Sequence, residues 1–507
     1  MTVALRATKP QGSAVIKESE FHSLAAQGFN RIPLVSEAFA DLETPLSLYL
    51  KLCAEDRRNS FLLESVVGGE RFGRYSFIGL PARTVVRATG TLTEVLTDGG
   101  VVERFEGNPL DFIAAYQERF KPSIPKGLPR FCGGLAGYFG YEAVRAIEHR
   151  LAGTRKTGGL GTPDIVLLLT EEVAIIDNLS GRLYLIVWAD PHEAGAYARA
   201  ASRLQMLGER LKRSIAAPEV PTTEPRPVAR GFAKEDYLAA VLRAKEYIAA
   251  GDLMQVQVGQ RLSKPYEADP IALYRALRTL NPSPYMYFYD LGEFQIVGAS
   301  PEILVREEHA GDGSRKVTIR PLAGTRPRGE TLERDLALEA ELQADPKERA
   351  EHLMLIDLAR NDIGRIARIG SVKVTQAFVV ERYSHVMHIV SNVEGVLRPE
   401  VGQLDVLKAT FPAGTLTGAP KVRAMELIDE LEPVQRGIYG GACGYLSFAG
   451  DMDLAIAIRT GIIKDGMLYV QAAAGVVADS VPELEWQETE AKARALLRAA
   501  ELVEGGF

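Results

Sequence analysis

The chain has 507 residues, of which 46% are apolar, 25% charged and 7% aromatic. This length excludes a single small binding module, and this composition excludes a broadly disordered chain. Lys and Arg number 59 against 66 Asp and Glu, and the resulting net charge of −7 argues against nucleic acid as the main partner, since phosphate binding depends on clustered cations.

Alternating apolar and polar residues mark the first predicted strands. Residues 84–102 alternate, and Asp98 with Gly99 provides the positive-φ turn that a tight hairpin needs. A second strand set covers residues 164–190, with a turn at residues 178–181. Between residues 193 and 215 the apolar positions recur every three or four residues, which is typical of an amphipathic helix. The first part of the chain is therefore expected to be rich in antiparallel strands.

A proline-rich stretch then changes the composition. Residues 216–231, AAPEVPTTEPRPVARG, contain four prolines and almost no large apolar side chains, so they fit neither a helix interior nor a central strand. We interpret this stretch as a linker. It divides the sequence into an N-terminal region at 20–215 and a C-terminal region at 232–505.

Helices and longer strands interleave after this linker. A helix is expected at 234–250, closed by Gly251, and another at 270–280. The expected strands lie at 254–262 (MQVQVGQRL), 294–300 (FQIVGAS), 316–324 (KVTIRPLAG), 453–463 (DLAIAIRTGII) and 467–477 (MLYVQAAAGVV), the last two joined by a turn at 464–466.

The last predicted element is a helix that starts at Pro482, with Asp479 or Ser480 as its N-cap. Taken together, these elements predict an α/β (α+β) fold in which helices are layered on large, mostly antiparallel sheets arranged as two sub-lobes.

The cysteines and the apolar runs bear on the compartment. Cys53, Cys132 and Cys443 lie far apart, so neither a disulfide framework nor a structural zinc site is indicated. The N-terminus lacks an apolar signal region, and apolar stretches end at charges before the roughly 18 residues that a membrane span needs. We expect a cytoplasmic protein with reduced, buried thiols.

Two pairs of carboxylates have helical spacing. Glu348 and Glu351 are three residues apart, and Glu485 and Glu488 repeat this spacing, so each pair lies on one face of its predicted helix. Such pairs are most often solvated helix surface. If the two helices face one another, however, hard oxygen ligands of this kind suit Mg²⁺ bridging the protein to an anionic ligand.

Histidines and glycine clusters provide further candidates. His385 and His388 lie three apart, and either could act as an acid or base or be a satisfied structural imidazole. Small residues cluster at 321–329, 411–421 and 471–475, where backbone N–H groups can approach an anion. None of these clusters has the spacing of a nucleotide-binding loop.

Six strings occur together in chain order: GASPE, PLAGTRPRG, ERAEHLMLIDLARND, YSHVMHIVS, FPAGTLTGAPKVRAME and AIAIRT. In this order they resemble the chorismate-utilising enzyme family. FLLESVVGGERFGRYSFIG and NPSPYMYF are in addition similar to its anthranilate synthase component I branch. The resemblance covers nearly the whole chain and implies the fold of that family, with region 232–505 as the chorismate-binding catalytic domain.

The resemblance also implies residue roles. Glu351 and Glu488 match Mg²⁺ ligands, and Glu348 and Glu485 match carboxylates that hold metal-bound water. Glu302 matches the general acid and His388 the residue involved in removing the C2 proton, whereas His385 matches a position without an assigned role. Residues that match the substrate-contacting positions are Gly324, Thr325, Thr415, Tyr439, Arg459, Ala473, Ala474 and Gly475.

The implied reaction is the amination of chorismate at C2 by ammonia with loss of the C4 hydroxyl, followed by pyruvate elimination to give anthranilate, the first committed step of tryptophan biosynthesis. Two departures favour this member of the family. Aminodeoxychorismate synthases carry a lysine nucleophile where this chain has Ala323, and isochorismate and salicylate synthases carry a lysine base where it has Gln255. An aminodeoxychorismate synthase component I and a catalytically silent tryptophan-sensing homologue remain as alternatives.

The resemblance extends to regulation and partners. Ser65, Pro284, Tyr285 and Met286 match a tryptophan feedback pocket, which would place part of that pocket in region 20–215. The alternative is that these residues are only a plain strand end and a packed turn. No cysteine has a nucleophile-elbow context. Ammonia is therefore expected from solution or from a glutamine amidotransferase subunit, component II, in a heterotetramer.

Overall fold

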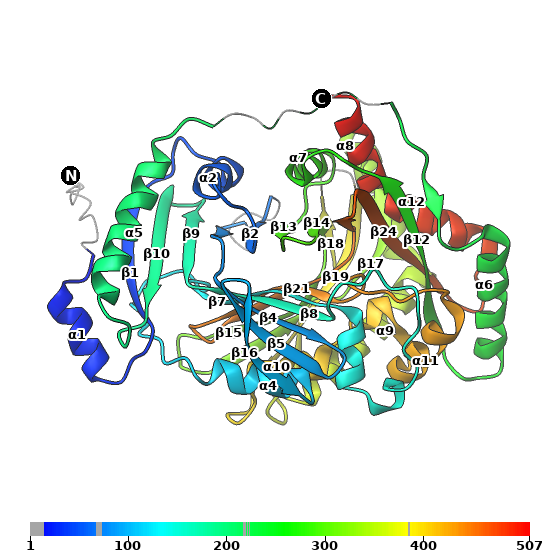
Figure 1. Cartoon of the computed structure of the whole chain (residues 1–507). Coiled ribbons are helices and arrows are strands. Elements are labelled where there is room, and N and C mark those ends of the chain that lie inside the picture. Colours follow the sequence, from blue (N-terminus) through cyan, green and yellow to red (C-terminus); the bar gives the residue numbers. More distant parts are fainter. Residues whose placement is uncertain are drawn as a thin grey trace, which may run out of the picture.

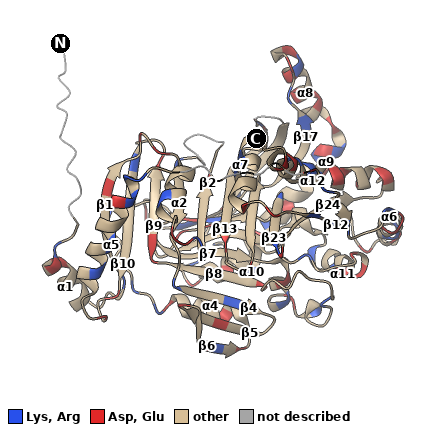
Figure 2. Cartoon of the chain, turned by 45° about the horizontal axis from the view of Figure 1, so that its top comes forward, with Lys and Arg blue, Asp and Glu red and all other residues tan. Residues whose placement is uncertain are grey.

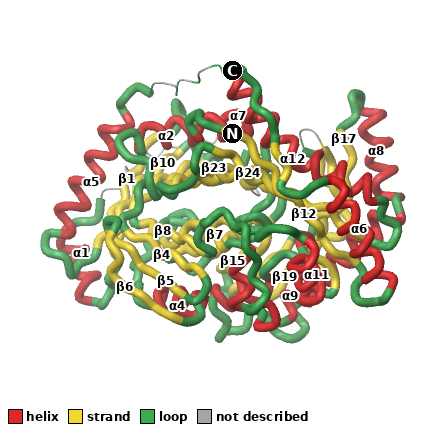
Figure 3. The backbone as a smooth tube through the Cα atoms, turned by 45° about the vertical axis from the view of Figure 1, so that its right-hand side comes forward, coloured by secondary structure: helices red, strands yellow, loops and turns green. Residues whose placement is uncertain are grey.

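The computed structural model describes residues 15–66, 73–215, 218, 220, 222, 224–383 and 386–506. His385, one of the candidate residues, lies outside them. The described chain forms two large sheets that stack face to face and are covered by helices on both outer sides (Figures 1 and 3). This arrangement confirms the expected fold of helices layered on large antiparallel sheets.

The first sheet has twelve strands within the described residues, paired antiparallel. Along the sheet, with β20 pairing β12 at its side, the order is β1 (Ile32–Phe39), β10 (Arg182–Ala189), β9 (Glu172–Asp177), β3 (Tyr75–Gly79), β2 (Ser60–Glu64), β13 (Tyr285–Asp290), β14 (Gln295–Ser300), β23 (Thr460–Lys464), β24 (Met467–Val476), β12 (Gln255–Pro265), β11 (Ala229–Arg230) and β20 (Gly418–Ala419).

The second sheet also has twelve strands within that part of the chain, again antiparallel. Its order, with β18 pairing β19 at its side, is β17 (Leu322–Pro327), β19 (Val386–Val396), β16 (Arg315–Ile319), β15 (Ile303–His309), β22 (Met452–Ile456), β21 (Ala442–Ser447), β7 (Gly134–Phe139), β8 (Ile165–Thr170), β4 (Thr84–Thr89), β5 (Leu92–Thr97), β6 (Gly100–Glu106) and β18 (Lys373–Arg382).

Helices cover the outer faces. The first sheet carries α1 (Glu18–Ala26), α2 (Pro45–Leu52), α5 (Ala196–Leu211), α7 (Pro270–Leu280) and α12 (Pro482–Glu504). The second carries α4 (Pro109–Gln117), α9 (Pro346–Gly364) and α10 (Gln403–Thr410), while α6 (Lys234–Ala249) and α11 (Lys421–Leu431) pack near β12. α8 (Leu332–Ala344) projects from the body beside β17, with charges of both signs along it (Figure 2). Short 3-10 helices are η1 (Tyr141–Ala146), η2 (His149–Leu151) and η3 (Gly414–Leu416).

The core has layers that follow this architecture. Between the sheets lies a cluster of aromatic and branched side chains, in which the Phe131 and Tyr445 rings stack with centroids 4.4 Å apart. Two larger apolar clusters lie between each sheet and its helices. The three cysteines are buried and free, as expected. None of the described helices has the length and apolar character needed to span a bilayer.

Most predicted elements form where the sequence placed them. α7 starts at Pro270, directly after the Asp269 side chain that accepts the Ile271 N–H, and it ends at Leu280 as expected. The turn at 178–181 joins β9 to β10, and Gly251, with φ +84°, follows α6. The expected hairpin at 84–102 is part of a three-stranded meander, because a further turn follows β4.

Three local expectations are wrong. The predicted strand at 453–463 is two strands, β22 and β23, which belong to different sheets, so the chain crosses between the sheets at residues 457–459. The stretch at 316–324 likewise breaks between β16 and β17. α12 starts at Pro482, but its N-cap is Val481 rather than Asp479 or Ser480, and the Ser480 hydroxyl instead accepts the Val477 N–H.

Both sheets combine strands from before and after the proline-rich stretch. β2 pairs with β13 in the first sheet, and β7 pairs with β21 in the second. Regions 20–215 and 232–505 are therefore separate in the sequence but share both sheets. Their assignment as two domains stays a prediction.

Candidate active site

One cavity of about 680 Å³ collects residues from both sheets and from two helices. Its walls include the ends of β12, β17, β19 and β24 together with one face each of α9 and α12. The predicted site residues that line it are Glu302, Gly324, Thr325, Glu348, Glu351, His388, Thr415, Tyr439, Arg459, Ala473, Gly475, Glu485 and Glu488. Residues spread over nearly 190 sequence positions, 302 to 488, thus meet around one space.

Ala474 is the predicted substrate-wall residue that does not line this cavity. It is fully buried in β24, where it pairs with Val258 of β12. Neighbouring residues of a strand point to opposite faces, so the Ala474 side chain points away from the face that carries the Ala473 side chain.

Glu302 lies between β14 and β15, buried in the cavity wall. The Thr415 hydroxyl donates a hydrogen bond to its Oε1 over 3.1 Å. Burial raises the pKa of Glu302 to about 8, and the Thr415 hydrogen bond and the nearby cations Arg459 and Lys492 offset only part of this rise. At neutral pH this carboxyl group is therefore mostly protonated and can donate a proton.

His388 lies in β19 with 2% of its surface exposed. Its Nδ1 is 2.9 Å from the Gly324 carbonyl oxygen, which only accepts hydrogen bonds, so Nδ1 carries the proton and Nε2 keeps its lone pair. Gly324 has φ +64° within an irregular part of β17, a conformation that glycine adopts readily. Burial lowers the pKa of His388 to about 4, so the ring is neutral and can accept a proton.

Arg459 occupies the crossing between β22 and β23 with a left-handed φ of +49°, which is uncommon for a residue other than glycine. Burial lowers the pKa of its guanidinium, although Glu302 opposes this effect. Within the described part of the chain Arg459 forms no ion pair. A guanidinium in a cavity wall without a carboxylate partner suits a ligand carboxylate.

The two carboxylate pairs face the same cavity, Glu348 and Glu351 from α9 and Glu485 and Glu488 from α12. Burial raises the pKa of Glu348 and that of Glu485, and in each case the other carboxylate of the pair raises it further. This like-charge effect indicates a local excess of negative charge that a cation would relieve.

The same carboxylates also have protein partners. Glu351 accepts a hydrogen bond from Gln255 Nε2 over 3.0 Å, Glu348 pairs with Arg326 at 3.3 Å, and Glu488 pairs with Lys492 at 2.6 Å. Across the described residues no three His, Cys, Asp or Glu side chains converge as a metal site. The donor type and the shared cavity fit Mg²⁺, which would have to compete with these pairs for the carboxylates.

Among the cavity residues that sequence reasoning missed are the polar side chains of Lys347, Tyr383 and Lys492. Lys492 follows Glu488 by four residues on α12, so helical spacing could have indicated it. Its ammonium donates to the Ala473 carbonyl over 2.9 Å and thus contacts the predicted substrate wall. The Tyr383 ring lies 5.7 Å from the His388 ring, a proximity that no sequence pattern signals.

The residues of the candidate inhibitor pocket also meet. Met286 of β13 pairs with Glu64 of β2, and the Val66 N–H donates to the Ser283 carbonyl over 3.3 Å. Ser65 is therefore next to the segment of Pro284, Tyr285 and Met286. Pro284 also lines the cavity described above, so the two candidate sites share a wall.

Comparisons with known proteins identify the family of the chain. Residues 63–498 match the chorismate binding enzyme family. Anthranilate synthase component 1 of Neisseria gonorrhoeae is 57% identical over 497 residues, covering 97% of this chain and 100% of that protein. The corresponding protein of Pseudomonas aeruginosa is 56% identical over 496 residues, covering 96% and 99%.

Solved structures show the same fold. Anthranilate synthase component I from Streptococcus pneumoniae superposes with a TM-score of 0.75 at 37% identity, covering 91% of this chain and 99% of that one. A menaquinone-specific isochorismate synthase from Escherichia coli, at 19% identity and a TM-score of 0.68, shares the fold over 95% of this chain and 98% of its own. The chain therefore belongs to the chorismate-binding enzyme family and, within it, to the anthranilate synthase component 1 lyases.

Proposed function

We propose that this chain catalyses the Mg²⁺-dependent conversion of chorismate and ammonia to anthranilate, pyruvate and water. The observation that carries the proposal is that a buried carboxyl group, Glu302, and a buried imidazole, His388, line one cavity, where burial shifts their pKa values in opposite directions. Glu302, with a pKa raised to about 8, holds a proton at neutral pH, and His388, with a pKa lowered to about 4, does not. Such a pair suits a reaction that needs one acid and one base.

Substrate binding follows from the charges of the cavity. Chorismate carries two carboxylates. Arg459 would receive the enolpyruvyl carboxylate, and Tyr439, Ala473 and Gly475 would form the adjoining wall. Glu351 and Glu488 would hold the metal directly, with Glu348 and Glu485 holding its waters. When bound, Mg²⁺ supplies the positive charge that binds the ring carboxylate and offsets the four protein carboxylates.

The proton transfers then involve the two buried groups. Glu302 would give its proton to the C4 hydroxyl, which leaves as water while ammonia forms a bond to C2 and the ring double bonds shift. The new C2 ammonium then loses one proton to the solvent and becomes an amine. His388 Nε2 would next take the proton from C2, the bond between the ring and the enolpyruvyl oxygen would break, and the ring would become aromatic. The released enolpyruvate takes up a proton at carbon to become pyruvate, so one ammonia enters and one water and one pyruvate leave.

Two cavity residues support ammonia as the nucleophile. Ala323 is buried in β17 and lines the cavity, where an amine nucleophile from the protein would be needed for an aminodeoxychorismate synthase. Gln255 also lines the cavity, and its amide donates to Glu351. A neutral amide cannot activate water as a base, which disfavours hydroxide attack.

Ammonia delivery and regulation complete the proposal. We infer that a glutamine amidotransferase subunit, component II, supplies ammonia, and that tryptophan binds where Ser65 meets the segment of Pro284, Tyr285 and Met286. The pairing of β2 with β13, which joins these two distant parts of the sequence, supports a ligand site at this position.

The test uses the purified full chain with chorismate, an ammonium salt and Mg²⁺. Anthranilate formation is followed by fluorescence and pyruvate by a coupled dehydrogenase, with the Glu302→Gln variant as the control. Equal rates of anthranilate and pyruvate release are expected. Consumption of chorismate without either product would favour an aminodeoxychorismate synthase, and no consumption at all would favour a silent homologue.

A further inference from the structure

A buried ion pair lies directly behind the cavity wall. Arg436 belongs to the segment between α11 and β21, and Glu432 follows the last residue of α11. Their side chains are 1% and 2% exposed. Arg436 Nη2 lies 2.6 Å from Glu432 Oε1, and Nε lies 3.0 Å from Oε2, so the contact is bidentate. Neither residue lines the cavity.

The remaining hydrogen bonds of this pair go to backbone groups of two other elements. Arg436 donates through Nη1 to the Leu416 carbonyl and through Nη2 to the Gln257 carbonyl at 3.3 Å. Glu432 Oε1 accepts the Gly259 N–H over 2.8 Å. A Cβ on residue 259 would lie only 3.0 Å from that oxygen, so glycine leaves room for the carboxylate.

These backbone groups belong to segments that line the cavity. Leu416 follows Thr415, whose hydroxyl bonds Glu302. β12, which includes Gln257, also contains Gln255, whose amide bonds Glu351. The pair therefore connects the wall that holds the candidate general acid to the wall that holds a candidate metal ligand.

A third wall residue lies against the same guanidinium. The Tyr439 ring centroid is 5.7 Å from the Arg436 guanidinium carbon, and Tyr439 lines the cavity as part of the proposed substrate wall. The ring of Tyr141 lies against the guanidinium as well, with its centroid 4.9 Å away. Because a guanidinium is planar with a fixed donor pattern, these contacts together fix the relative positions of the elements that it touches.

Stability alone does not account for the pair. Removing two charges from water is costly, and well-packed apolar side chains of similar volume often stabilise a fold as well or better. What a hydrogen-bonded pair adds is a defined geometry for the backbone groups that it binds. At Leu416 the guanidinium satisfies a carbonyl at the end of the short helix η3, which holds Thr415 toward Glu302.

We propose that Arg436 and Glu432 are positioning residues for the reaction: together they hold the Thr415 segment, β12 and Tyr439 in the arrangement that catalysis needs, without touching the substrate. The inference rests on the proposed function, because it concerns the rate of that reaction. The two can fail separately, since wild-type protein that makes no anthranilate contradicts the proposed function, whereas variants with wild-type rates contradict only the positioning role.

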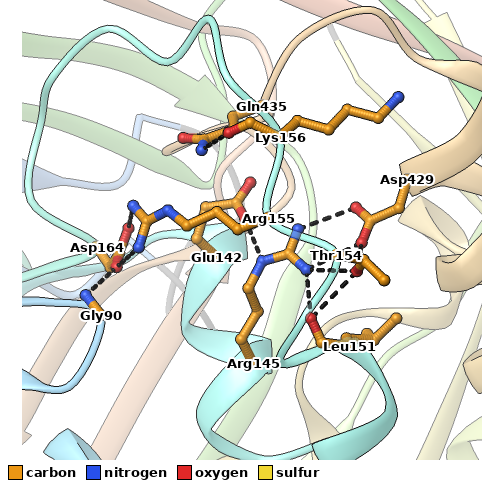
Figure 4. Close-up of polar contacts among 10 residues, drawn as sticks. All are labelled: Gly90, Glu142, Arg145, Leu151, Thr154, Arg155, Lys156, Asp164, Asp429 and Gln435. Carbon is orange, nitrogen blue, oxygen red and sulfur yellow. Dashed lines mark hydrogen bonds and ion pairs between the residues drawn. The ribbon is translucent and has the colours of Figure 1, made fainter.

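The experiment compares Arg436→Lys with a matched control, Arg145→Lys. The Arg145 side chain is 10% exposed and likewise has a bidentate carboxylate partner in α11. It binds Asp429 at 2.9 and 3.0 Å and also pairs with Glu142 (Figure 4). None of its hydrogen-bond partners, Glu142, Leu151, Thr154 and Asp429, lines the cavity. Lysine keeps the charge in both variants but lacks the planar donor pattern.

For Arg436→Lys, kcat should fall by about 10- to 100-fold with little change in the KM for chorismate, as expected when catalytic groups shift by up to an ångström. Arg145→Lys should stay within about twofold of wild-type kcat, because its contacts are remote from the wall. Thermal melting is measured for both. If the two variants lose kcat equally, or if Arg436→Lys keeps wild-type kcat, Arg436 has only a structural role.

A pH profile adds a readout that a purely structural role would not move. If the Thr415 segment shifts in Arg436→Lys, the hydrogen bond from Thr415 to Glu302 is lost. The pKa of Glu302, which Arg459 and Lys492 also lower, should then rise. The alkaline limb of kcat/KM should therefore move to higher pH. The double variant Glu432→Gln/Arg436→Gln leaves no unpaired buried charge. If the single variant does not fold, the same kinetic and pH measurements are made on the double variant. A wild-type kcat and an unmoved limb in the double variant would also overturn the inference.

Discussion

The hydrogen bond from Thr415 to Glu302 offers a quantitative test of the proposed general acid. Replacing Thr415 by Val keeps the branched shape but removes the hydroxyl that donates to Oε1 over 3.1 Å. This bond stabilises the carboxylate form, so its loss raises the pKa of Glu302. A hydrogen bond to a charged group contributes about 1.5–3 kcal/mol, and one pKa unit corresponds to about 1.4 kcal/mol, so the rise should be about 1–2 units.

The sign of the expected change in the rate profile follows from the role of Glu302. A general acid works in its protonated form, so activity falls as the pH rises through its pKa, which is about 8 in the wild type. In Thr415→Val the alkaline limb of kcat/KM should therefore lie about 1–2 units higher. The maximum rate should also fall, because an acid with a higher pKa donates its proton less readily and because Thr415 lines the substrate cavity.

The assay is anthranilate fluorescence at a series of pH values, with Thr410→Val as the control. Thr410 is also buried, but its hydroxyl donates to the Val406 carbonyl over 2.9 Å rather than to Glu302. The control should leave the alkaline limb in place. A limb that stays at the wild-type pH in Thr415→Val, or that moves to lower pH, would refute the assignment of this limb to Glu302.

Three further predictions concern other residues. Glu351→Gln and Glu488→Gln should each remove Mg²⁺-dependent activity with little loss of fold, since both side chains line the cavity. Activity and thermal melting are measured on the same samples. Wild-type turnover in either variant would rule out the metal assignment. His388→Met should still consume chorismate while releasing less anthranilate and pyruvate, as product analysis would show; a complete stop in consumption would contradict the late role. Ser65→Arg should abolish tryptophan inhibition and leave ammonia-dependent synthesis nearly unchanged, which rate measurements with and without tryptophan decide.

Local sequence signals predicted where helices, strands and turns lie better than they predicted which strands pair with one another. Asp269 and Pro270 define the start of α7, and the turn at 178–181 is visible as a cluster of turn residues. The crossing at 457–459 is not visible, because the apolar pattern of 453–463 is the same whether a strand stays in one sheet or enters another. Propensity describes neighbours along the chain, whereas sheet membership depends on distant strands.

The same distinction holds for the site. Helical spacing identified the carboxylate pairs of α9 and α12, and the family resemblance supplied Glu302, His388 and Arg459 as candidates. Nothing in the sequence pairs Arg436 with Leu416 or Gln257, because those hydrogen bonds join a side chain to backbone carbonyls of remote segments. Contacts of this kind depend on the folded backbone and follow no residue pattern.

The interleaving of early and late strands in both sheets has a consequence for how the chain folds. β2 and β7 are central strands, yet their partners β13 and β21 emerge far later during synthesis. Until then the early strands present unpaired backbone edges and apolar faces, which favour association between nascent chains. Strands that are separated by so many residues of the chain pair slowly. Productive folding must therefore wait for nearly the whole polypeptide, and dilute conditions during refolding should raise the yield of native protein.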